Sequence, residues 1–180
     1  MCWQGTVRDM VELDCVSISS AFAEQGWNKP LRQYQDYWRE MQQGLRTVLV
    51  AEDSGQFAGY VTIVWQSECP PFRQHGIPEI VDLNVLIKYR RRGIGSALMD
   101  AAETRVGSRS NVVGIGVGLP ADYGPAQIMY VKRGYAPDGR GLCRGARQLR
   151  YGETVVVDDD LTLYFTKRSP VGSGSERGAG

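Results

Sequence analysis

Residues 79–105, EIVDLNVLIKYRRRGIGSALMDAAETR, decide the fold that the sequence predicts. Their first part alternates apolar and polar side chains, the period of two that is typical of a strand with one face towards a core. After a turn that contains glycine, apolar residues recur at the three-and-four spacing of a helix, at Ile94, Ala97, Leu98, Ala101 and Ala102. The stretch therefore predicts a strand, a tight basic turn and a helix.

The turn lies where the strand becomes the helix, a position that favours binding of a phosphate. The first turn of a helix leaves about four backbone N–H groups without internal partners, and the helix dipole adds partial positive charge there. Gly93 and Gly95 lack a Cβ, so a ligand can approach the backbone closely. Residues 90–92 are all arginine, and Ser96 adds a hydroxyl donor.

Three kinds of phosphate-binding turn can be compared with this one. A P-loop ends in Lys followed by Ser or Thr, but here Ser96 follows Gly95. The dinucleotide fingerprint needs a third glycine where this chain has Leu98. The remaining pattern, Arg90-x-x-Gly93-x-Gly95 after an apolar strand, resembles the acyl-CoA signature of the GNAT family of N-acetyltransferases.

A second stretch, residues 123–135 (YGPAQIMYVKRGY), resembles the other signature of that family. Pro125 near its start and Gly134 at its end bracket a short helix. Ala126, Tyr130 and the pair of Gly134 with an aromatic residue match the family spacing. Tyr123 stands where the family usually has Asn, which puts one polar contact with the cofactor in doubt.

The resemblance covers about residues 1–167 and implies a mixed α/β fold, in which helices flank a central mixed sheet with splayed parallel strands. We expect a single domain over residues 1–168 and a flexible Gly/Ser-rich tail over 169–180. Strand-like runs at 47–51 and 57–65, joined by a glycine-containing loop, predict an antiparallel pair.

The rest of the chain gives weaker signals. Helices are expected over 10–23 and from Pro30 to about residue 43, and strands over 1–8, 112–117, 148–151 and 161–166, with 155–157 as a possible extension. Residues 67–78 and 137–145 are rich in Pro and Gly, so loops are predicted there. The aromatic stripe of Tyr34, Tyr37 and Trp38 is expected to pack in the core, with substrate contact as the weaker alternative.

The resemblance implies acetyl-CoA as the cosubstrate. The end of the central strand would hold its pantetheine arm through backbone hydrogen bonds, and the amides of residues 91–96 would hold its pyrophosphate. The positions implied for cofactor binding are Val85, Leu86, Ile87, Arg91, Arg92, Gly93, Ile94, Gly95, Ser96, Tyr123, Ala126 and Tyr130.

The implied reaction is direct attack of an amine on the thioester of acetyl-CoA. An amine with a pKa near ~10.4 must first lose a proton at neutral pH, and a carboxylate can accept it. Glu79 is the first candidate for this base and Asp82 the second; the alternative for either is orienting an ammonium or pairing with an arginine. The backbone N–H of Val85 would stabilise the oxyanion, and Tyr130 would protonate the leaving thiolate.

Composition excludes other classes of function. With 21 basic and 20 acidic residues, the chain shows no overall charge that favours nucleic acid or an anionic membrane. No apolar run approaches the ~20 residues of a membrane span, so a cytoplasmic protein is expected. The four cysteines lack metal-ligand spacing, His75 is the one histidine, and residues 158–160 (DDD) are expected to form a polar turn, so no metal site is predicted.

The sequence thus predicts an N-acetyltransferase that acts on a primary amine of a small molecule. A protein or peptide amine is the alternative acceptor. A different class of function also stays open, in which the chain is a non-catalytic acyl-CoA sensor or interaction module. A homodimer is possible from the resemblance, although no residue pattern identifies an interface.

Overall fold

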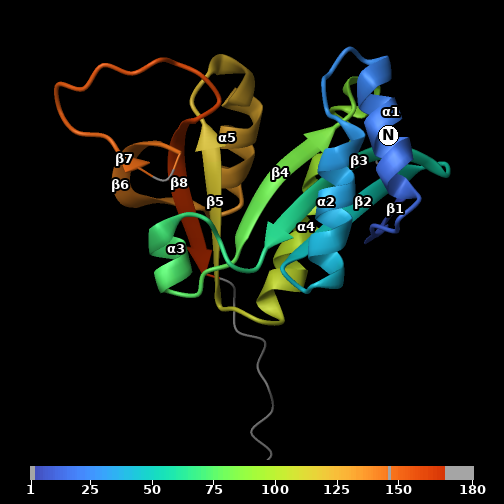
Figure 1. Cartoon of the computed structure of the whole chain (residues 1–180), viewed down its shortest axis with the longest axis horizontal. Helices are drawn as coiled ribbons and strands as arrows, with labels where there is room; N and C mark the ends of the chain where they lie inside the picture. The colour runs from blue at the N-terminus through green and yellow to red at the C-terminus, as the bar shows by residue number, and fades with distance from the viewer. Residues whose placement is uncertain (1–2, 146, 169–180) are drawn as a thin grey trace, which may run out of the picture.

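The computed structural model describes residues 3–145 and 147–168, which form one mixed sheet of eight strands in the order β1-β2-β3-β4-β5-β8-β6-β7. Helices cover both of its faces (Figure 1). The strands are β1 (Thr6–Asp9), β2 (Arg46–Asp53), β3 (Gln56–Val64), β4 (Glu79–Val85), β5 (Val112–Gly118), β6 (Ala136–Arg144), β7 (Arg147–Gln148) and β8 (Leu161–Arg168). The helices are α1 (Asp14–Glu24), α2 (Leu31–Gln42), α3 (Pro70–Gln74), α4 (Ile94–Gly107) and α5 (Gly124–Lys132), with short 3₁₀ turns η1 (Ile87–Tyr89) and η2 (Ala121–Tyr123).

The helices divide between the two faces of the sheet because alternate strand residues point to opposite sides. Helices α4 and α5 pack on one face, where Leu98 and Tyr130 belong to the same apolar cluster as Ile80 and Ile115 of the strands. On the other face, α1 and α2 pack over Val48 and Tyr60, and α3 lies further along the same side (Figure 1). This layering confirms the predicted mixed α/β fold.

The central parallel strands, β4 and β5, pair only at their beginnings. Glu79 lies opposite Gly114, and Ile80 lies opposite Ile115, after which the register ends. Beyond this point the two strands diverge towards their carboxyl ends, as Figure 1 shows. The sheet is therefore open at the edge where parallel α/β sheets bind ligands.

Strand β4 also contains an irregularity. Val81 pairs with Thr62 and Asn84 with Tyr60, so Asp82 and Leu83 together lie opposite one residue of β3. Asp82 has a φ of 55°, a left-handed conformation that few non-glycine residues adopt. The strict alternation that the sequence predicts for this strand is thus broken at Asp82.

Several boundaries differ from the sequence predictions. The predicted loop over 137–145 is wrong for residues 137–144, which belong to β6; there Gly139 and Gly141 have positive φ, and the register with β8 shifts between Pro137 and Leu142. The predicted loop over 67–78 contains the one-turn helix α3. Residues 155–157 do not extend a strand, and α1 begins at Asp14 rather than near residue 10.

The remaining sequence predictions concern membrane spans, metal ligands and the tail. No described helix is long and apolar enough to cross a membrane. Within residues 3–145 and 147–168, no three His, Cys, Asp or Glu side chains are grouped as metal ligands. Asp158 instead pairs with Arg144 at 2.7 Å, and His75 is exposed. The predicted tail, 169–180, lies outside the described residues.

Candidate active site

A cleft of about 930 Å³ opens where β4 and β5 diverge. Its walls come from the connection between α1 and α2, from β4, from the turn before α4, from the end of β5, and from α5. The sequence-predicted residues that line it are Glu79, Asp82, Val85, Arg91, Gly93, Ile94, Gly95, Ser96, Tyr123, Ala126 and Tyr130. The two sequence signatures therefore meet in one cleft.

The turn before α4 forms one end of this cleft and presents free backbone amides there. Among the described residues, no backbone or side-chain group accepts a hydrogen bond from the amides of residues 91–96. Arg91 has a φ of 59° and Gly93 a φ of 89°. Left-handed residues within a turn direct neighbouring N–H groups into a concavity that suits an anion. Six unsatisfied donors at a helix N-terminus are the geometry of a phosphate site.

The three arginines of the turn lie in different places. Arg90 and Arg91 line the cleft, and the Arg90 side chain donates to the carbonyl of Val85 at 3.3 Å. Arg92, which was predicted to bind the cofactor, is not among the cleft-lining residues. Its guanidinium pairs with Asp53 at 3.0 Å and lies over the ring of Tyr89, so it points towards β2.

The end of β4 offers fewer backbone groups than the sequence suggested. The amide of Leu86 donates to Ala58 and its carbonyl accepts from Tyr89. The amide of Ile87 donates to Gln25 and its carbonyl accepts from Arg90. Neither residue lines the cleft, because both have already turned into η1. Their backbone groups are used within the protein.

Val85 differs from these two residues. Because the Leu86 amide points to β3, strand alternation directs the Val85 amide and carbonyl away from β3. The Val85 carbonyl accepts the Arg90 side chain, and Val85 lines the cleft. Its backbone is thus available at the open edge of the sheet.

On the opposite wall, Tyr130 of α5 presents an unpaired hydroxyl to the cleft. The side chain is only 6% exposed, and no described residue forms a hydrogen bond with its hydroxyl. Burial raises the pKa of Tyr130 to about 12, and the nearby Tyr123 contributes a smaller part of this increase. The phenol therefore stays protonated at neutral pH and can serve as a proton donor.

Tyr123 and Ala126 lie beside Tyr130 on the same wall. The Tyr123 hydroxyl donates to Asp159 at 3.2 Å. Its ring packs so closely on β5 that a Cβ at Gly118 would lie 2.7 Å from it, so only glycine fits there. Burial and Asp159 raise the pKa of Tyr123 to about 12.

Glu79, at the start of β4, is a buried carboxyl group in the cleft and is 8% exposed. The hydroxyl of Ser67 donates to one of its oxygens, Oε2, and no described side chain pairs with the other. Burial raises the pKa of Glu79, and the hydrogen bond from Ser67 opposes this only in part. A carboxylate with a raised pKa is a stronger base than an ordinary glutamate.

Asp82, three residues further, has the opposite surroundings. It accepts hydrogen bonds from Lys29 Nζ at 3.0 Å, Tyr60 OH at 2.5 Å and Tyr37 OH at 3.0 Å, and also from Gln33 and Asn84. Burial opposes ionisation of Asp82 most strongly, but Lys29 and the hydroxyl donors outweigh it and lower the pKa. Asp82 is therefore held as a carboxylate.

No sequence pattern marked Lys29 as a candidate site residue. Its ammonium also donates to Tyr60 OH at 3.1 Å and lies 5.5 Å from the centre of the Phe22 ring. Its side chain is 20% exposed and lines the cleft beside Trp27. No spacing in the sequence relates Lys29 to Asp82, which are 53 positions apart, so the pairing could be found only in three dimensions.

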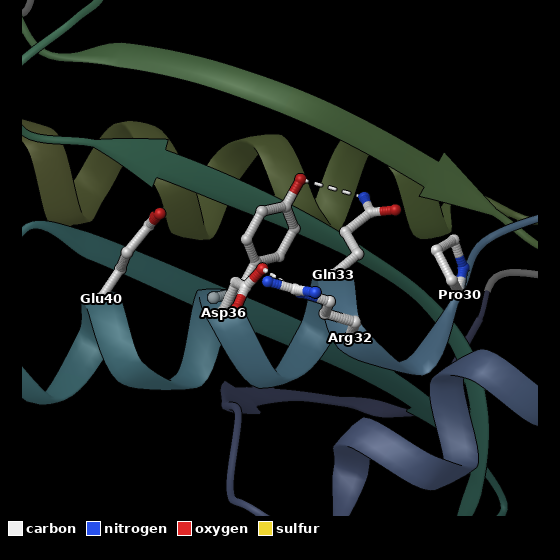
Figure 2. A pocket seen from close by; sticks show the side chains of 6 residues that line it. Pro30, Arg32, Gln33, Asp36 and Glu40 are labelled. Carbon is white, nitrogen blue, oxygen red and sulfur yellow. Dashed lines mark hydrogen bonds and ion pairs between the residues drawn. The ribbon is translucent and has the colours of Figure 1, made fainter.

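The aromatic stripe of α2 continues this network outwards. Tyr34 is fully buried against Tyr60, which is the expected core role, whereas Tyr37 reaches Asp82. A second pocket of about 390 Å³ lies along α2, and Figure 2 shows the side chains that line it. There Gln33 extends towards the sheet, and Arg32 lies beside Asp36 on the helix surface (Figure 2).

Residues 13–135 match the model of the acetyltransferase (GNAT) family. No curated protein sequence gives a significant match. Three solved structures illustrate the likeness of fold, all below 25% identity.

A ribosomal-protein-alanine N-acetyltransferase from Brucella melitensis has a TM-score of 0.68 at 18% identity, covering 91% of this chain and 99% of that one. Ard1 from Thermoplasma volcanium has a TM-score of 0.65 at 20% identity, and the match covers 91% of this chain and 97% of that one. The third structure is YncA from Salmonella typhimurium, a putative acetyltransferase solved with acetyl-CoA. It has a TM-score of 0.67 at 14% identity, and the match covers 96% of this chain and 98% of that one. The family match spans well over half of the chain, and the chain therefore belongs to the acetyltransferase (GNAT) family.

Proposed function

We propose that the protein is an N-acetyltransferase that transfers the acetyl group of acetyl-CoA to a primary amine of a small molecule. One observation carries the proposal. A single cleft joins the free amides of residues 91–96 to a buried carboxyl group, Glu79, and to an unpaired buried phenol, Tyr130. These are the groups that phosphate binding, amine deprotonation and thiolate protonation require.

Acetyl-CoA supplies the activated acetyl group in this scheme. The amides of residues 91–96 and the side chains of Arg90 and Arg91 bind its phosphates, and the Val85 edge of β4 accepts its pantetheine arm. Arg90 releases the Val85 carbonyl when that edge is taken. Tyr123 and Ala126 border the same site. Leu86, Ile87 and the side chain of Arg92 have no part in it because these groups are engaged elsewhere.

The acceptor amine reaches the thioester from the opposite face of the sheet. Trp27 and Lys29, from the connection between α1 and α2, line the cleft on that face, as does Tyr164, which packs on α3. Glu79 lines the same cleft as these residues. Two substrates that enter from opposite faces can react directly, so no covalent enzyme intermediate is needed.

Glu79 is the proton acceptor in this scheme and Asp82 is not. The raised pKa of Glu79 makes it the stronger base, whereas five donors already occupy Asp82. The amine loses its proton to Glu79 and attacks the thioester carbonyl. The Val85 amide stabilises the resulting oxyanion. The carbon–sulfur bond then breaks, and Tyr130 gives its proton to the departing thiolate.

The experiment is release of CoA thiol from acetyl-CoA across a panel of small amines, amino acids, aminoglycosides and lysine peptides. We expect a small amine to stimulate release. Tyr130→Phe should lower kcat about 10- to 100-fold, while calorimetry shows acetyl-CoA binding within about twofold of wild type. Tyr135→Phe is the matched control, since Tyr135 is a buried tyrosine that packs against Tyr130 but does not line the cleft.

Three other results would change the proposal. Unchanged turnover in Tyr130→Phe would remove this residue from the mechanism. Stimulation by lysine peptides alone would assign a protein acceptor. Binding of acetyl-CoA without turnover of any amine would favour the sensor function.

A further inference from the structure

The cleft has two ends of opposite character. At the phosphate end lie the free amides of residues 91–96 with Arg90 and Arg91. Away from them, the charged groups that line the cleft are four carboxylates and one ammonium, namely Glu79, Asp82, Asp122, Asp159 and Lys29. Because Lys29 pairs with Asp82, the remaining carboxylates carry the charge of this end.

Two of these carboxylates, Asp122 and Asp159, have no cationic partner among the described residues. Asp159 accepts one hydrogen bond, from Tyr123, and Asp122 accepts none from a described side chain. The neighbouring acids differ, since Arg144 pairs with Asp158 at 2.7 Å and lies 3.9 Å from Asp160. Asp122 and Asp159 are exposed at the cleft rim and face solvent with unused oxygens.

These carboxylates are close to the groups proposed to react. The Tyr123 hydroxyl donates to Asp159 at 3.2 Å, and Asp122, Tyr123 and Tyr130 line the same cleft. Independently of the acids, Tyr130 is more than nine-tenths buried and has no described hydrogen-bond partner in this cleft. A largely buried side chain whose free hydroxyl opens onto the cleft points to a ligand bound beside it.

The hydrogen-bonding capacity at this end is also one-sided. The hydroxyls of Tyr123, Thr162 and Tyr164 already donate to protein oxygens. Apart from the Tyr130 hydroxyl and the Trp27 indole N–H, the unused polar atoms among the described residues are acceptor oxygens: one of Glu79, the amide oxygen of Asn84, and those of the rim carboxylates. A ligand that satisfies them must bring N–H donors and positive charge.

We propose that the acceptor is a dication, a primary amine that carries a second cationic group, and that Asp122 and Asp159 bind this second group while the reacting amine lies at Glu79. The inference rests on the proposed function and narrows it to a substrate class. An acceptor with a carboxylate in place of the second cation is disfavoured because it would meet the same rim acids.

The test compares three amines with the same five-carbon chain: 1,5-diaminopentane, pentylamine and 5-aminopentanoate. Their remote ends are positive, neutral and negative. We expect kcat/KM for the diamine, divided by two for its equivalent amines, to exceed that of pentylamine by about three- to tenfold, the range for one or two exposed ion pairs. 5-Aminopentanoate should be the poorest substrate. The preference should shrink at high salt because exposed charges are screened.

Variants assign the preference to the rim acids. Asp159→Asn and Asp122→Asn should each lower the ratio of diamine to pentylamine, and the double variant should bring it to about one. Asp160→Asn is the matched control, because Asp160 is an exposed neighbour that does not line the cleft, and it should keep the wild-type ratio. All three positions are on the surface, so the variants should fold.

An equal or higher kcat/KM for pentylamine or 5-aminopentanoate would overturn the inference while leaving the transferase function intact. An unchanged ratio in the double variant would do the same. If none of the amines released CoA from protein that binds acetyl-CoA, the proposed function would itself fail, and this inference with it.

Discussion

The surroundings of Glu79 and of Asp82 differ sharply, although both carboxyl groups lie on β4 and line the same cleft. Glu79 is buried with one hydroxyl donor, Ser67, and its pKa is raised. Asp82 is held by an ammonium, two phenols and two side-chain amides, and its pKa is lowered. Position on a strand therefore does not decide the chemistry of a carboxyl group. The donors that surround it do.

The largest expected effect concerns activity. Glu79→Gln should lower kcat/KM at neutral pH by about 100-fold or more, because removing a general base costs about 10²- to 10⁴-fold. The wild-type rate should fall as pH drops below the raised pKa of Glu79, and the variant should lose this limb of the pH profile. If Asp82→Asn lost the limb instead while Glu79→Gln kept it, the roles of the two carboxyl groups would be exchanged.

The next effect concerns stability. Asp82→Ala should lower the free energy of unfolding by about 2–3 kcal/mol, because it leaves the Lys29 ammonium and buried hydroxyls such as that of Tyr60 without their acceptor. Urea denaturation measures this loss in the free energy of unfolding. Asp122→Ala is the control, because Asp122 is an exposed carboxylate without a cationic partner among the described residues. A loss no greater than that of the control would show that the network around Asp82 does not stabilise the fold.

The two carboxyl groups should also have opposite effects on how stability depends on pH. The folded-state pKa of Asp82 lies below its unfolded value of about 3.9, so Asp82 stabilises the fold above that pH and the contribution is lost as pH falls through the folded pKa. The folded-state pKa of Glu79 lies above its unfolded value of about 4.3, so its contribution is present below that pH and is lost as pH rises.

Unfolding of both neutral variants from pH 3 to pH 8 checks these signs. Relative to wild type, Glu79→Gln should become more stable as pH rises, whereas Asp82→Asn should become less stable. If the stabilities of the two variants, relative to wild type, changed in the same direction with pH, the opposite pKa shifts of Glu79 and Asp82 would be contradicted.

The smallest effect concerns Ser67. Its hydroxyl lowers the pKa of Glu79, so Ser67→Ala should move the acid limb of kcat/KM to higher pH and reduce the rate on that limb by about two- to threefold. Ser67 also accepts the amide of Cys69, so some loss of stability should accompany the shift. Cys69→Ser controls for disturbance of this segment, and an equal shift there would show that the effect is not due to the lost hydroxyl.

Local sequence patterns were sufficient for the elements that carry their own signals. The turn from β4 into α4 was predicted because glycine, arginine and the change of period from two to 3.6 all occur within residues 79–105. Helix α5 was predicted from Pro125 and Gly134. Strand β6 was not, because Gly139 and Gly141 resemble loop residues; they lie in an irregular stretch, and the residues on either side of it pair with β8.

The sequence by itself determined the strand, turn and helix that form one end of the cleft, where we propose that phosphate binds, and the spacing of Ala126 and Tyr130 along one helix. Those features depend on neighbours a few positions apart, which local propensity and periodicity control. The tertiary structure decided which carboxyl group is free. Lys29 approaches Asp82 from 53 positions away, and Ser67 reaches Glu79 through a loop. The pKa of each group depends on these long-range contacts, which no local pattern records.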